Sequence, residues 1–379
     1  MASSRPECAM AISEAEQSKA SVGAWRMLDA SANRAAEAIR VLEDALRFIL
    51  NDVHLARQAK AIRHDLAVVL AGAACSQRIR LRDVPGDVGA GMTVARTPPR
   101  ATLTDLIAAN AARGSQAFRS LEECSRLVAP DNAVAFERFR YRLYTLERAA
   151  LTAVASRERL KDVRLCVLLA TGSSEEAFHN LVDQLLDAGV GMLQLRDKTA
   201  SLPLLCQRTA AAVAIARRHA EASGVPRCLV IVNDRADVAA ANGADGVHVG
   251  ADDLPVPLAR RICGPHLLVG RTAHSMEEAQ QAVLDGADYL GVGPCFPSAT
   301  KEFSSFAPKD FLQQVAAEVS LPAFAIGGIT PDRLEQLAGL GVSRVAVSAA
   351  VTAAADPGAV VRQFSQWLKN WSQPEQAVV

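Results

Sequence analysis

The chain has 379 residues, enough for two domains, and half of them are hydrophobic, enough to form substantial cores. Lysine plus arginine and aspartate plus glutamate both number 41, so the charge balance indicates neither nucleic acid nor a membrane surface as a partner. No apolar run reaches the length of a membrane span, and the first residues lack the apolar core of a signal peptide. Eight scattered cysteines without metal-binding spacing indicate reduced thiols. We therefore expect a cytoplasmic protein.

The first part of the chain has a helical pattern. Residues 1–22 are rich in Ser, Ala and Glu without firm periodicity, which predicts disorder. Residues 23–155 are predicted to form an all-α helical bundle, because apolar residues such as Ala38, Leu42 and Ala45 recur on one helical face. The predicted elements are helices over Asn33–Leu50, Val53–Ala71, Thr102–Leu127 and Asp131–Ala155, with a loop over Ser76–Pro99.

One pattern occurs twice in this part of the chain. The stretch Arg34–Asp44 reappears at Arg113–Glu123, with basic, acidic and apolar residues in nearly the same order. Two helical hairpins related in this way would form a pseudo-symmetric bundle. The alternative is that both stretches are ordinary amphipathic helices with i,i+3 and i,i+4 charge pairs. The pattern alone leaves both interpretations open.

The loop between the two halves has the composition of a ligand-binding segment. Its run RDVPGDVGAG, residues 82–91, has glycines that permit close approach of the backbone to a ligand. Charge comes from Arg80, Arg82, Asp83 and Asp87. We therefore expect any ligand of the helical domain to bind near this loop.

From about Lys161 onward, short β-branched runs alternate with helical stretches, and eight such pairs can be counted. This alternation predicts an α/β fold, a TIM (β/α)8 barrel over residues 156–372, followed by a tail at 373–379. A doubly wound sheet is the alternative, but it rarely uses eight such regular units. The predicted strands are Val163–Leu169, Met192–Arg196, Cys228–Val232, Gly246–Val249, Leu267–Gly270, Tyr289–Gly293, Ala323–Ile326 and Arg344–Val347.

Two acidic residues follow neighbouring strands of this barrel. Asp234 comes shortly after the run CLVIV, and Asp253 follows the run GVHVG. The C-terminal ends of barrel strands carry the chemistry, so both carboxylates should face one pocket, where they repel each other unless a cation lies between them. Oxygen ligands of this kind suit Mg²⁺ together with phosphate. We predict one Mg²⁺ per barrel, held by Asp234 and Asp253.

Cationic residues follow the second predicted strand. Alternation along the strand places Gln194, Arg196 and Lys198 on one side. Leu195 and Asp197 alternate to the other side. An arginine and a lysine beside an amide indicate an anion site, most simply for phosphate. The alternative is a surface cluster of salt bridges.

Further small and polar residues stand after later strands. The run GPCFPSATK, which follows the sixth strand, has two prolines, two hydroxyls and Lys301. The seventh strand ends in Gly327 and Gly328, and Ser348 follows the last strand before a helix. Paired glycines and a small hydroxyl at these positions are typical of the phosphate site of such barrels. Together these signals predict a metal site, a cationic cluster and a second phosphate site on one rim.

Residues 163–371 resemble thiamine phosphate synthase. The resemblance rests on QLRDK at 194–198, NDRADVA at 233–239, GADDLP at 250–255, GRTAH at 270–274, GPCFPSATK at 293–301, AIGGI at 325–329 and VS at 347–348. It implies a transferase that condenses hydroxymethylpyrimidine diphosphate with a thiazole phosphate, or its carboxylated form. The products would be thiamine phosphate and pyrophosphate.

The resemblance also implies a role for each residue of the rim. Arg196, Lys198 and Lys301 would act on the leaving pyrophosphate as catalytic residues, and Asp234 and Asp253 would bind Mg²⁺. The implied substrate-binding residues are Gln194, Leu195, Arg196, Asp197, Lys198, Asn233, Thr272, Ser298, Ala299, Thr300, Lys301, Gly328, Val347 and Ser348.

The chain departs from the family pattern at three positions. Thr272 stands where the family usually has Ser, and Ser298 stands where it often has Thr, so both keep a hydroxyl. Ala251 stands where the family usually has Gln. Because alanine cannot donate or accept with its side chain, one polar contact near the metal turn would be missing.

The helical part resembles a domain that is sometimes fused ahead of this enzyme and is proposed to be a hydroxymethylpyrimidine phosphate kinase. The stretches RMLDASANRAAEAIRVLED at 26–44 and RDVPGDVGAG at 82–91 carry this resemblance. The chain has no P-loop, so a kinase would need an unconventional phosphate site. A structural role for the bundle is the alternative.

Two other functions compete for the barrel. A thiazole tautomerase would bind thiazole phosphate alone and would not need the carboxylates or the cationic cluster. A non-catalytic sensor of thiamine phosphates would use the bundle to bind a partner. We otherwise expect small phosphorylated substrates as the partners, with no nucleic acid and no membrane, and a homo-oligomer remains open.

Overall fold

The computed structural model describes residues 14–72, 74–88, 99–297 and 306–371. The chain divides into two compact units, Met1–Ile49 with Leu55–Glu147, and Leu50–His54 with Arg148–Val379. The predicted domain boundary between residues 155 and 156 lies further along the same helix and stays a prediction. In the described part of the chain, no helix has both the length and the apolar character that crossing a membrane requires.

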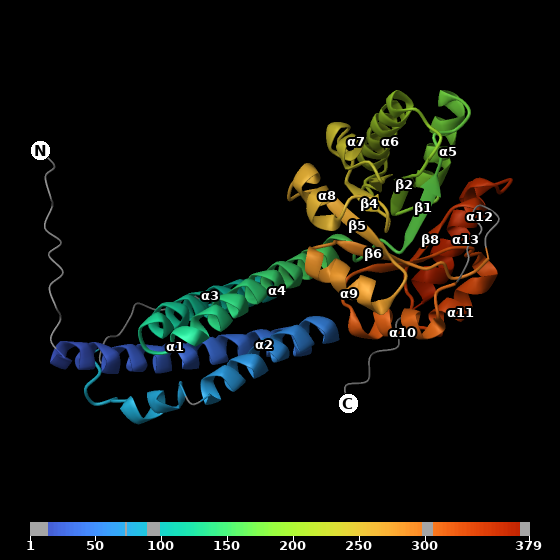
Figure 1. Cartoon of the computed structure of the whole chain (residues 1–379). Coiled ribbons are helices and arrows are strands. Elements are labelled where there is room, and N and C mark those ends of the chain that lie inside the picture. Colours follow the sequence, from blue (N-terminus) through green and yellow to red (C-terminus); the bar gives the residue numbers. More distant parts are fainter. Residues whose placement is uncertain (1–13, 73, 89–98, 298–305, 372–379) are drawn as a thin grey trace, which may run out of the picture. The chain divides into compact units, whose positions relative to one another are not determined.

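Long helices build the first unit (Figure 1). Helix α1 begins at Glu14, so the prediction of disorder is wrong for residues 14–22, and the helix predicted from Asn33 is only its second half. A 3-10 helix, η1, occupies the start of the segment predicted as a loop. The elements are α1 Glu14–Phe48, α2 Val53–Ala71, η1 Ser76–Leu81, α3 Leu103–Val128, η2 Pro130–Asn132 and α4 Ala133–Arg159.

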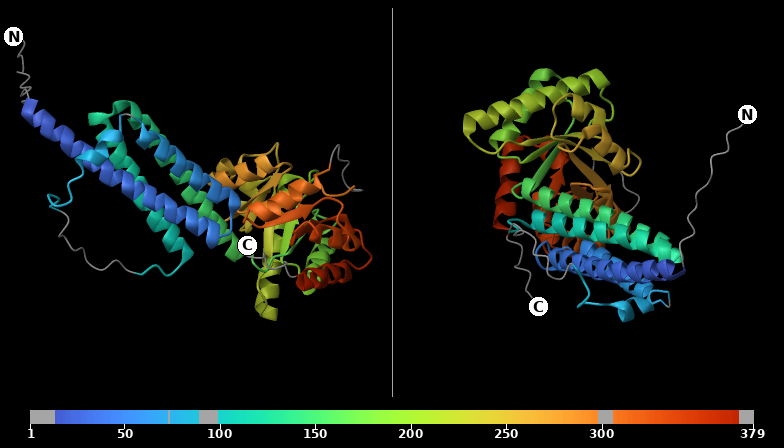
Figure 2. Two further views of the ribbon diagram at one scale, coloured as in Figure 1. Left: turned by 90° about the horizontal axis from the view of Figure 1, so that it is seen from below. Right: turned by 90° about the vertical axis from the view of Figure 1, so that its left-hand side faces the viewer.

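The two repeated stretches lie on α1 and α3, and these two helices pack against each other. Gly114 permits this approach: a Cβ atom there would lie 3.6 Å from Cβ of Ala38 and 2.8 Å from Leu143 of α4. The long helices accordingly run alongside one another in both views of Figure 2. The start of α3 is set by a capping box, in which Thr102 and Asp105 each accept the other's backbone N–H at 3.1 Å.

Equivalent ion pairs support the pseudo-symmetric interpretation of the repeat. Glu43 of α1 accepts a hydrogen bond from Arg63 of α2 at 2.7 Å. At the equivalent position of α3, Glu122 accepts one from Arg140 of α4 at 3.1 Å. Both carboxylates belong to buried residues. Each helix of the repeat is therefore joined to the next helix by the same type of contact.

The second unit is a closed barrel of parallel strands in the order β1 to β8, which confirms the predicted TIM barrel and excludes the doubly wound sheet. Helices surround the strands in Figures 1 and 2. The strands are β1 Leu165–Leu169, β2 Met192–Leu195, β3 Leu229–Asn233, β4 Gly246–Val249, β5 Leu268–Ala273, β6 Tyr289–Val292, β7 Ala323–Ile326 and β8 Val345–Val347. The helices are α5 Glu175–Asp187, α6 Leu202–Ser223, α7 Ala236–Ala241, α8 Val256–Cys263, α9 Met276–Asp285, α10 Lys309–Glu318, η3 Pro331–Arg333, α11 Leu334–Ala338, α12 Ala349–Thr352 and α13 Pro357–Asn370.

An apolar core fills the interior of the barrel beneath the strand ends that carry the site. Inward residues of successive strands, among them Met192, Ile231 and Phe324, form one buried cluster with Tyr289. Gly270 makes room for the Tyr289 ring, since a Cβ atom at Gly270 would lie 2.2 Å from it. The barrel interior is therefore filled with side chains, and polar groups can collect only toward the ends of the strands.

Candidate active site

A buried chain of polar side chains covers the apolar core. His248 of β4 lies 2.9 Å from the Thr272 hydroxyl through Nε2 and 3.3 Å from the Tyr289 hydroxyl through Nδ1. Tyr289 also makes a side-chain hydrogen bond with Gln194 of β2. Burial lowers the pKa of His248 to about 4, so the imidazole is neutral at physiological pH. This chain holds two predicted substrate-binding residues, Gln194 and Thr272, in position.

Asp234 and Asp253 come together at the C-terminal ends of β3 and β4. Asp234 has a left-handed backbone, with φ of 62°, and its N–H donates to the His248 carbonyl at 2.8 Å. The Gly250 N–H donates to Asp253 Oδ2 at 2.8 Å. The two carboxyl groups share a side-chain hydrogen bond. The structure thus brings both acidic residues together at one point of the rim.

The environment separates the pKa values of these two carboxyl groups. Burial, and then the hydrogen bond and negative charge of Asp253, raise the pKa of Asp234 to about 6. Burial alone would also raise the pKa of Asp253, but the hydrogen bonds from Asp234 and the Gly250 N–H, together with nearby positive charge, hold it below its usual range. Of the two carboxyl groups, Asp234 is therefore the one that takes up a proton first as pH falls.

Cations surround this pair. The positive charges of Lys198 and Arg196 favour the ionised form of Asp234, and those of Lys198 and Arg271 favour that of Asp253. Arg271 also donates to the Gly250 carbonyl and so ties the end of β5 to the turn that carries Asp253. The predicted cationic cluster and the predicted carboxylates are thus one site. This turn is held by Arg271 and the Asp253–Gly250 contact, while Ala251 contributes no side-chain hydrogen bond.

Two residues of the predicted set lie elsewhere. Leu195 is 1% exposed and alternates with the inward-facing Gln194, so its side chain lies on the outer side of β2. Asp197 accepts hydrogen bonds from the backbone and hydroxyl of both Thr171 and Thr199, at 2.7 to 3.2 Å, and from the Ala200 N–H. These bonds hold the pKa of Asp197 well below its usual range. The side chain of Asp197 therefore positions two loops of the rim instead of joining the cluster.

Close packing explains the paired glycines after β7. Gly327 and Gly328 have φ values of 101° and 60°. A Cβ atom at Gly328 would lie 2.2 Å from the Pro297 carbonyl oxygen, so only glycine fits beneath the loop that follows β6. Val347 is buried in β8, and Ser348 is the N-cap residue of α12. The structure places these residues at the predicted rim.

Five predicted residues of the rim remain, and the structure describes one of them, Asn233. Asn233 is the last residue of β3 and is directly followed by Asp234. Ser298, Ala299, Thr300 and Lys301 lie outside the described residues, so their predicted roles stay predictions. Sequence reasoning assigned no role to His248, Tyr289 and Arg271. Two of them had a visible signal: His248 is a polar residue at an inward position between two valines, and Arg271 stands in the motif GRTAH at 270–274.

The donor set of this site fits a hard divalent cation that binds together with a phosphorylated substrate. Within the described ranges, no group of three or more His, Cys, Asp or Glu side chains is placed to hold a metal. Mg²⁺ commonly takes one or two protein carboxylates and completes its coordination with water and phosphate oxygens. The hydrogen-bonded carboxyl pair supplies two such ligands, and the raised pKa of Asp234 reflects burial and a neighbouring negative charge that a cation would offset.

Comparison with known proteins agrees with this geometry. Residues 165–351 match the family described as thiamine monophosphate synthase, and residues 26–149 match the ThiD2 family. A thiamine-phosphate synthase of Rhodopirellula baltica is 42% identical over 337 residues, which cover 86% of this chain and 88% of the relative. The chain belongs to the thiamine-phosphate synthase family.

Another thiamine-phosphate synthase, from Gloeobacter violaceus, is 40% identical over a match that covers 91% of this chain and 97% of the relative. A solved thiamine phosphate pyrophosphorylase from Pyrococcus furiosus is 30% identical, with a TM-score of 0.47, over 55% of this chain and 96% of its own. The family relation confirms the resemblance found in the sequence. The chain is a thiamine-phosphate synthase by family, an enzyme of the transferase class in thiamine biosynthesis.

Proposed function

We propose that the barrel joins 4-amino-2-methyl-5-hydroxymethylpyrimidine diphosphate to a thiazole phosphate, or its carboxylated form, and releases thiamine phosphate and pyrophosphate. One observation supports the proposal above all. The carboxyl pair of Asp234 and Asp253 lies at the C-terminal ends of the strands, close enough to Arg196 and Lys198 to interact with their positive charges. Such a site offers metal ligands and cations to a diphosphate. It works on small phosphorylated molecules, and we place it in the cytoplasm, as the sequence predicts.

The reaction breaks the bond between the pyrimidine CH₂ and a diphosphate oxygen and forms a bond from that CH₂ to the thiazole nitrogen. The aminopyrimidine ring stabilises positive charge on the CH₂, so the site chiefly has to stabilise the leaving pyrophosphate. Arg196, Lys198 and Lys301 bind its oxygens. Mg²⁺ held by Asp234 and Asp253 would neutralise further charge on the diphosphate. No nucleophilic side chain is required.

The other predicted residues orient the two substrates. Gln194 and Asn233 offer amides to the pyrimidine, and Gln194 is already held by Tyr289. Ser298, Ala299 and Thr300 are predicted to hold the thiazole, and Thr272 is predicted to offer its hydroxyl to a substrate. The thiazole phosphate binds near Gly328, Val347 and Ser348. Because the two substrates then use different parts of the rim, their binding can be tested separately.

An assay of the purified full-length protein with both precursors and Mg²⁺ tests this function. We expect thiamine phosphate and pyrophosphate in equal amounts. Conversion of a thiazole phosphate isomer without condensation would indicate the tautomerase. Binding of thiamine phosphate with no turnover of either precursor would indicate the sensor.

We also propose that the helical domain phosphorylates the pyrimidine monophosphate and so supplies the diphosphate to the barrel. The match of residues 26–149 to the ThiD2 family supports this step. Its test is formation of thiamine phosphate from the monophosphate, thiazole phosphate, ATP and Mg²⁺. If the protein uses the diphosphate but not the monophosphate with ATP, the kinase proposal is wrong and the structural role remains.

A further inference from the structure

The helical unit contains a cavity that the sequence did not predict. It has a volume of about 650 Å³ and lies between α1, α2 and η1. Pockets for small molecules commonly have volumes of roughly 300 to 1,000 Å³. Four alanines from α1 and α2 contribute to its walls, and Arg40, Arg63 and Arg78 add three guanidinium groups. The cavity therefore combines a smooth apolar surface with concentrated positive charge.

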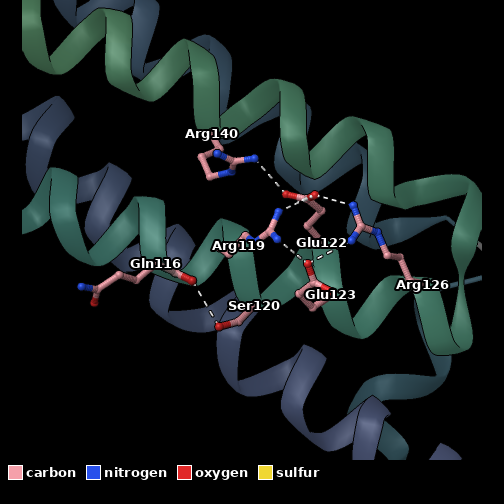
Figure 3. Close-up of polar contacts among 7 residues, drawn as sticks. All are labelled: Gln116, Arg119, Ser120, Glu122, Glu123, Arg126 and Arg140. Atoms are coloured by element: carbon pink, nitrogen blue, oxygen red, sulfur yellow. Dashed lines mark hydrogen bonds and ion pairs between the residues drawn. The ribbon is translucent and has the colours of Figure 1, made fainter.

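The repeat supplies an internal comparison for these arginines. Arg40 of α1 is the counterpart of Arg119 of α3. Arg119 makes ion pairs of 2.8 Å with both Glu122 and Glu123 (Figure 3). In α1, carboxylates stand at the same spacing, yet Arg40 has no ion pair within the described residues, because Glu43 binds Arg63 instead. The second repeat neutralises its arginine, whereas the first leaves the charge of Arg40 at the cavity.

Arg78 is held in place at a second side of the cavity. Its Nη1 donates to the Leu70 and Cys75 carbonyls at 2.7 and 3.0 Å, which joins η1 to the end of α2. Its Nε is 3.6 Å from Asp29 and is buried without a hydrogen-bond partner in the described structure. The facing Asp29 Oδ1 is also buried without a hydrogen-bond partner, so the two groups form a long ion pair, and Asp29 is shared with Arg82. Arg40 is thus a cation without an ion pair among the described residues, and Arg78 adds positive charge that the shared Asp29 compensates only in part.

The position of the cavity agrees with the two stretches that resemble the fused kinase-type domain. The first stretch, 26–44, contributes Asn33 and Arg40 to the lining. The second begins at Arg82, whose Nε donates to Asp29 Oδ2 at 2.8 Å. The loop that the sequence singled out is therefore anchored next to the cavity, while the lining itself comes from the helices before it.

We propose that this cavity binds a small phosphate ester with a flat ring, with the phosphate at Arg40 and Arg78 and the ring against the alanines. Guanidinium groups suit phosphate because their paired N–H donors match its oxygens. The small side chains of Ala32, Ala36, Ala67 and Ala71 leave space for a planar ring. The identity of the ligand as the pyrimidine monophosphate rests on the kinase function proposed above.

Titration calorimetry with hydroxymethylpyrimidine monophosphate tests this proposal. Full-length proteins are compared, all carrying Arg196→Ala, which weakens the diphosphate site of the barrel; any phosphate binding that the barrel retains is the same in every variant. We expect Arg40→Gln to weaken binding by about tenfold or more, since it removes a charged contact to the phosphate. Arg119→Gln is the matched control, because it removes the equivalent arginine, and its affinity should stay within about twofold. Thermal unfolding of both variants checks that the bundle is intact.

Three results would overturn the proposal: no binding by the Arg196→Ala parent, unchanged affinity in Arg40→Gln, or equal losses in both variants. The kinase assay separates the two ideas. If monophosphate binds through Arg40 but ATP yields no diphosphate, the kinase proposal fails and the binding site stands. If Arg40→Gln makes diphosphate with an unchanged KM for the monophosphate, the kinase stands and the site assignment fails.

Discussion

Asp234 and Asp253 come from the turns after neighbouring strands, and their side chains share a hydrogen bond at the rim of the barrel. Without a cation, the negative charge of Asp253 adds to the effect of burial, so that the pKa of Asp234 is raised to about 6. A divalent cation between the two would offset this repulsion and let both carboxylates bind it in ionised form. This relationship leads directly to the first prediction.

Asp234→Asn or Asp253→Asn should lower turnover by roughly a hundredfold, or about 2.7 kcal/mol, because each removes a ligand charge from the pair. Each variant should also need more Mg²⁺. The measurement is the initial rate of thiamine phosphate formation across a Mg²⁺ titration, with a chelator as the zero point. Wild-type rates for both variants at limiting Mg²⁺ would contradict the assignment of these two carboxylates.

Arg196→Ala should weaken use of the pyrimidine diphosphate by about tenfold or more, because it removes a charge-assisted contact to the leaving group. The same holds for Lys301→Ala. Affinity for thiazole phosphate, measured by calorimetry, should stay within about twofold in both. Loss of thiazole phosphate binding in both variants would show that these cations are placed on the wrong substrate.

Asp197 should make the stability of the barrel depend on acid pH. Because hydrogen bonds lower its pKa in the folded state, its stabilising effect is complete above the unfolded pKa near 4 and is lost as pH falls below that value. Asp197→Asn should therefore lower the free energy of unfolding by about 1–3 kcal/mol at pH 7 and by less at pH 3.

Urea unfolding in a Trp25→Phe background can follow this effect, since the other tryptophans, Trp367 and Trp371, both lie in the barrel unit. An equal difference between the two proteins at both pH values would mean that Asp197 does not act through its ionised carboxylate.

Glu122 should matter far more to the bundle than its neighbour Glu123. Both bind Arg119 and Arg126, but the side chain of Glu122 is 2% exposed and that of Glu123 is 49% exposed. Glu122 also binds Arg140. Glu122→Gln should destabilise the bundle by about 3–5 kcal/mol, because it leaves buried arginine charge without its partner. Glu123→Gln should cost less than about 1 kcal/mol. Unfolding followed through Trp25 in a background in which Trp367 and Trp371 are both changed to Phe measures both, and similar losses would contradict the prediction.

The barrel should fold and work without the bundle. Residues 156–379 keep Ser156, which donates to Asp288 at 2.9 Å, and Arg159, which donates to the His266 carbonyl at 2.6 Å. A longer fragment from Arg148 keeps a further contact, to the Leu284 carbonyl, and should be the more stable of the two. Both should make thiamine phosphate from the diphosphate. A folded fragment that stays inactive until residues 1–155 are added back would disprove independence.

The sequence was sufficient for those parts of the fold that follow from local periodicity. The eight short apolar runs became eight strands, with ends that differ by a few residues, as in β1 from Leu165 instead of Val163. Asp234 and Asp253 could be paired in advance because parallel strands bring their C-terminal ends to one rim. Each of these inferences needed only the order of residues along one or two strands.

The missed features all depend on contacts between distant elements. His248 is explained by Thr272 and Tyr289, which belong to other strands. The hydrogen bonds of Asp197 were not predicted, because nothing in its own run reveals Thr171 on the preceding loop. The cavity beside Arg40 depends on how α1, α2 and η1 pack, although the repeat that exposes its unpaired charge was visible in the sequence.

The paired glycines after β7 have a practical consequence for laboratory evolution of the rim. Any side chain at position 328 would clash with the Pro297 and Phe296 carbonyls, so most variants in a library at this position would not fit, whatever substrate is selected for. Diversity is better placed at Asn233, the last residue of β3, or at Thr272 near the end of β5 on the same rim. A changed substrate preference is therefore more accessible through the strand ends than through the glycine turn.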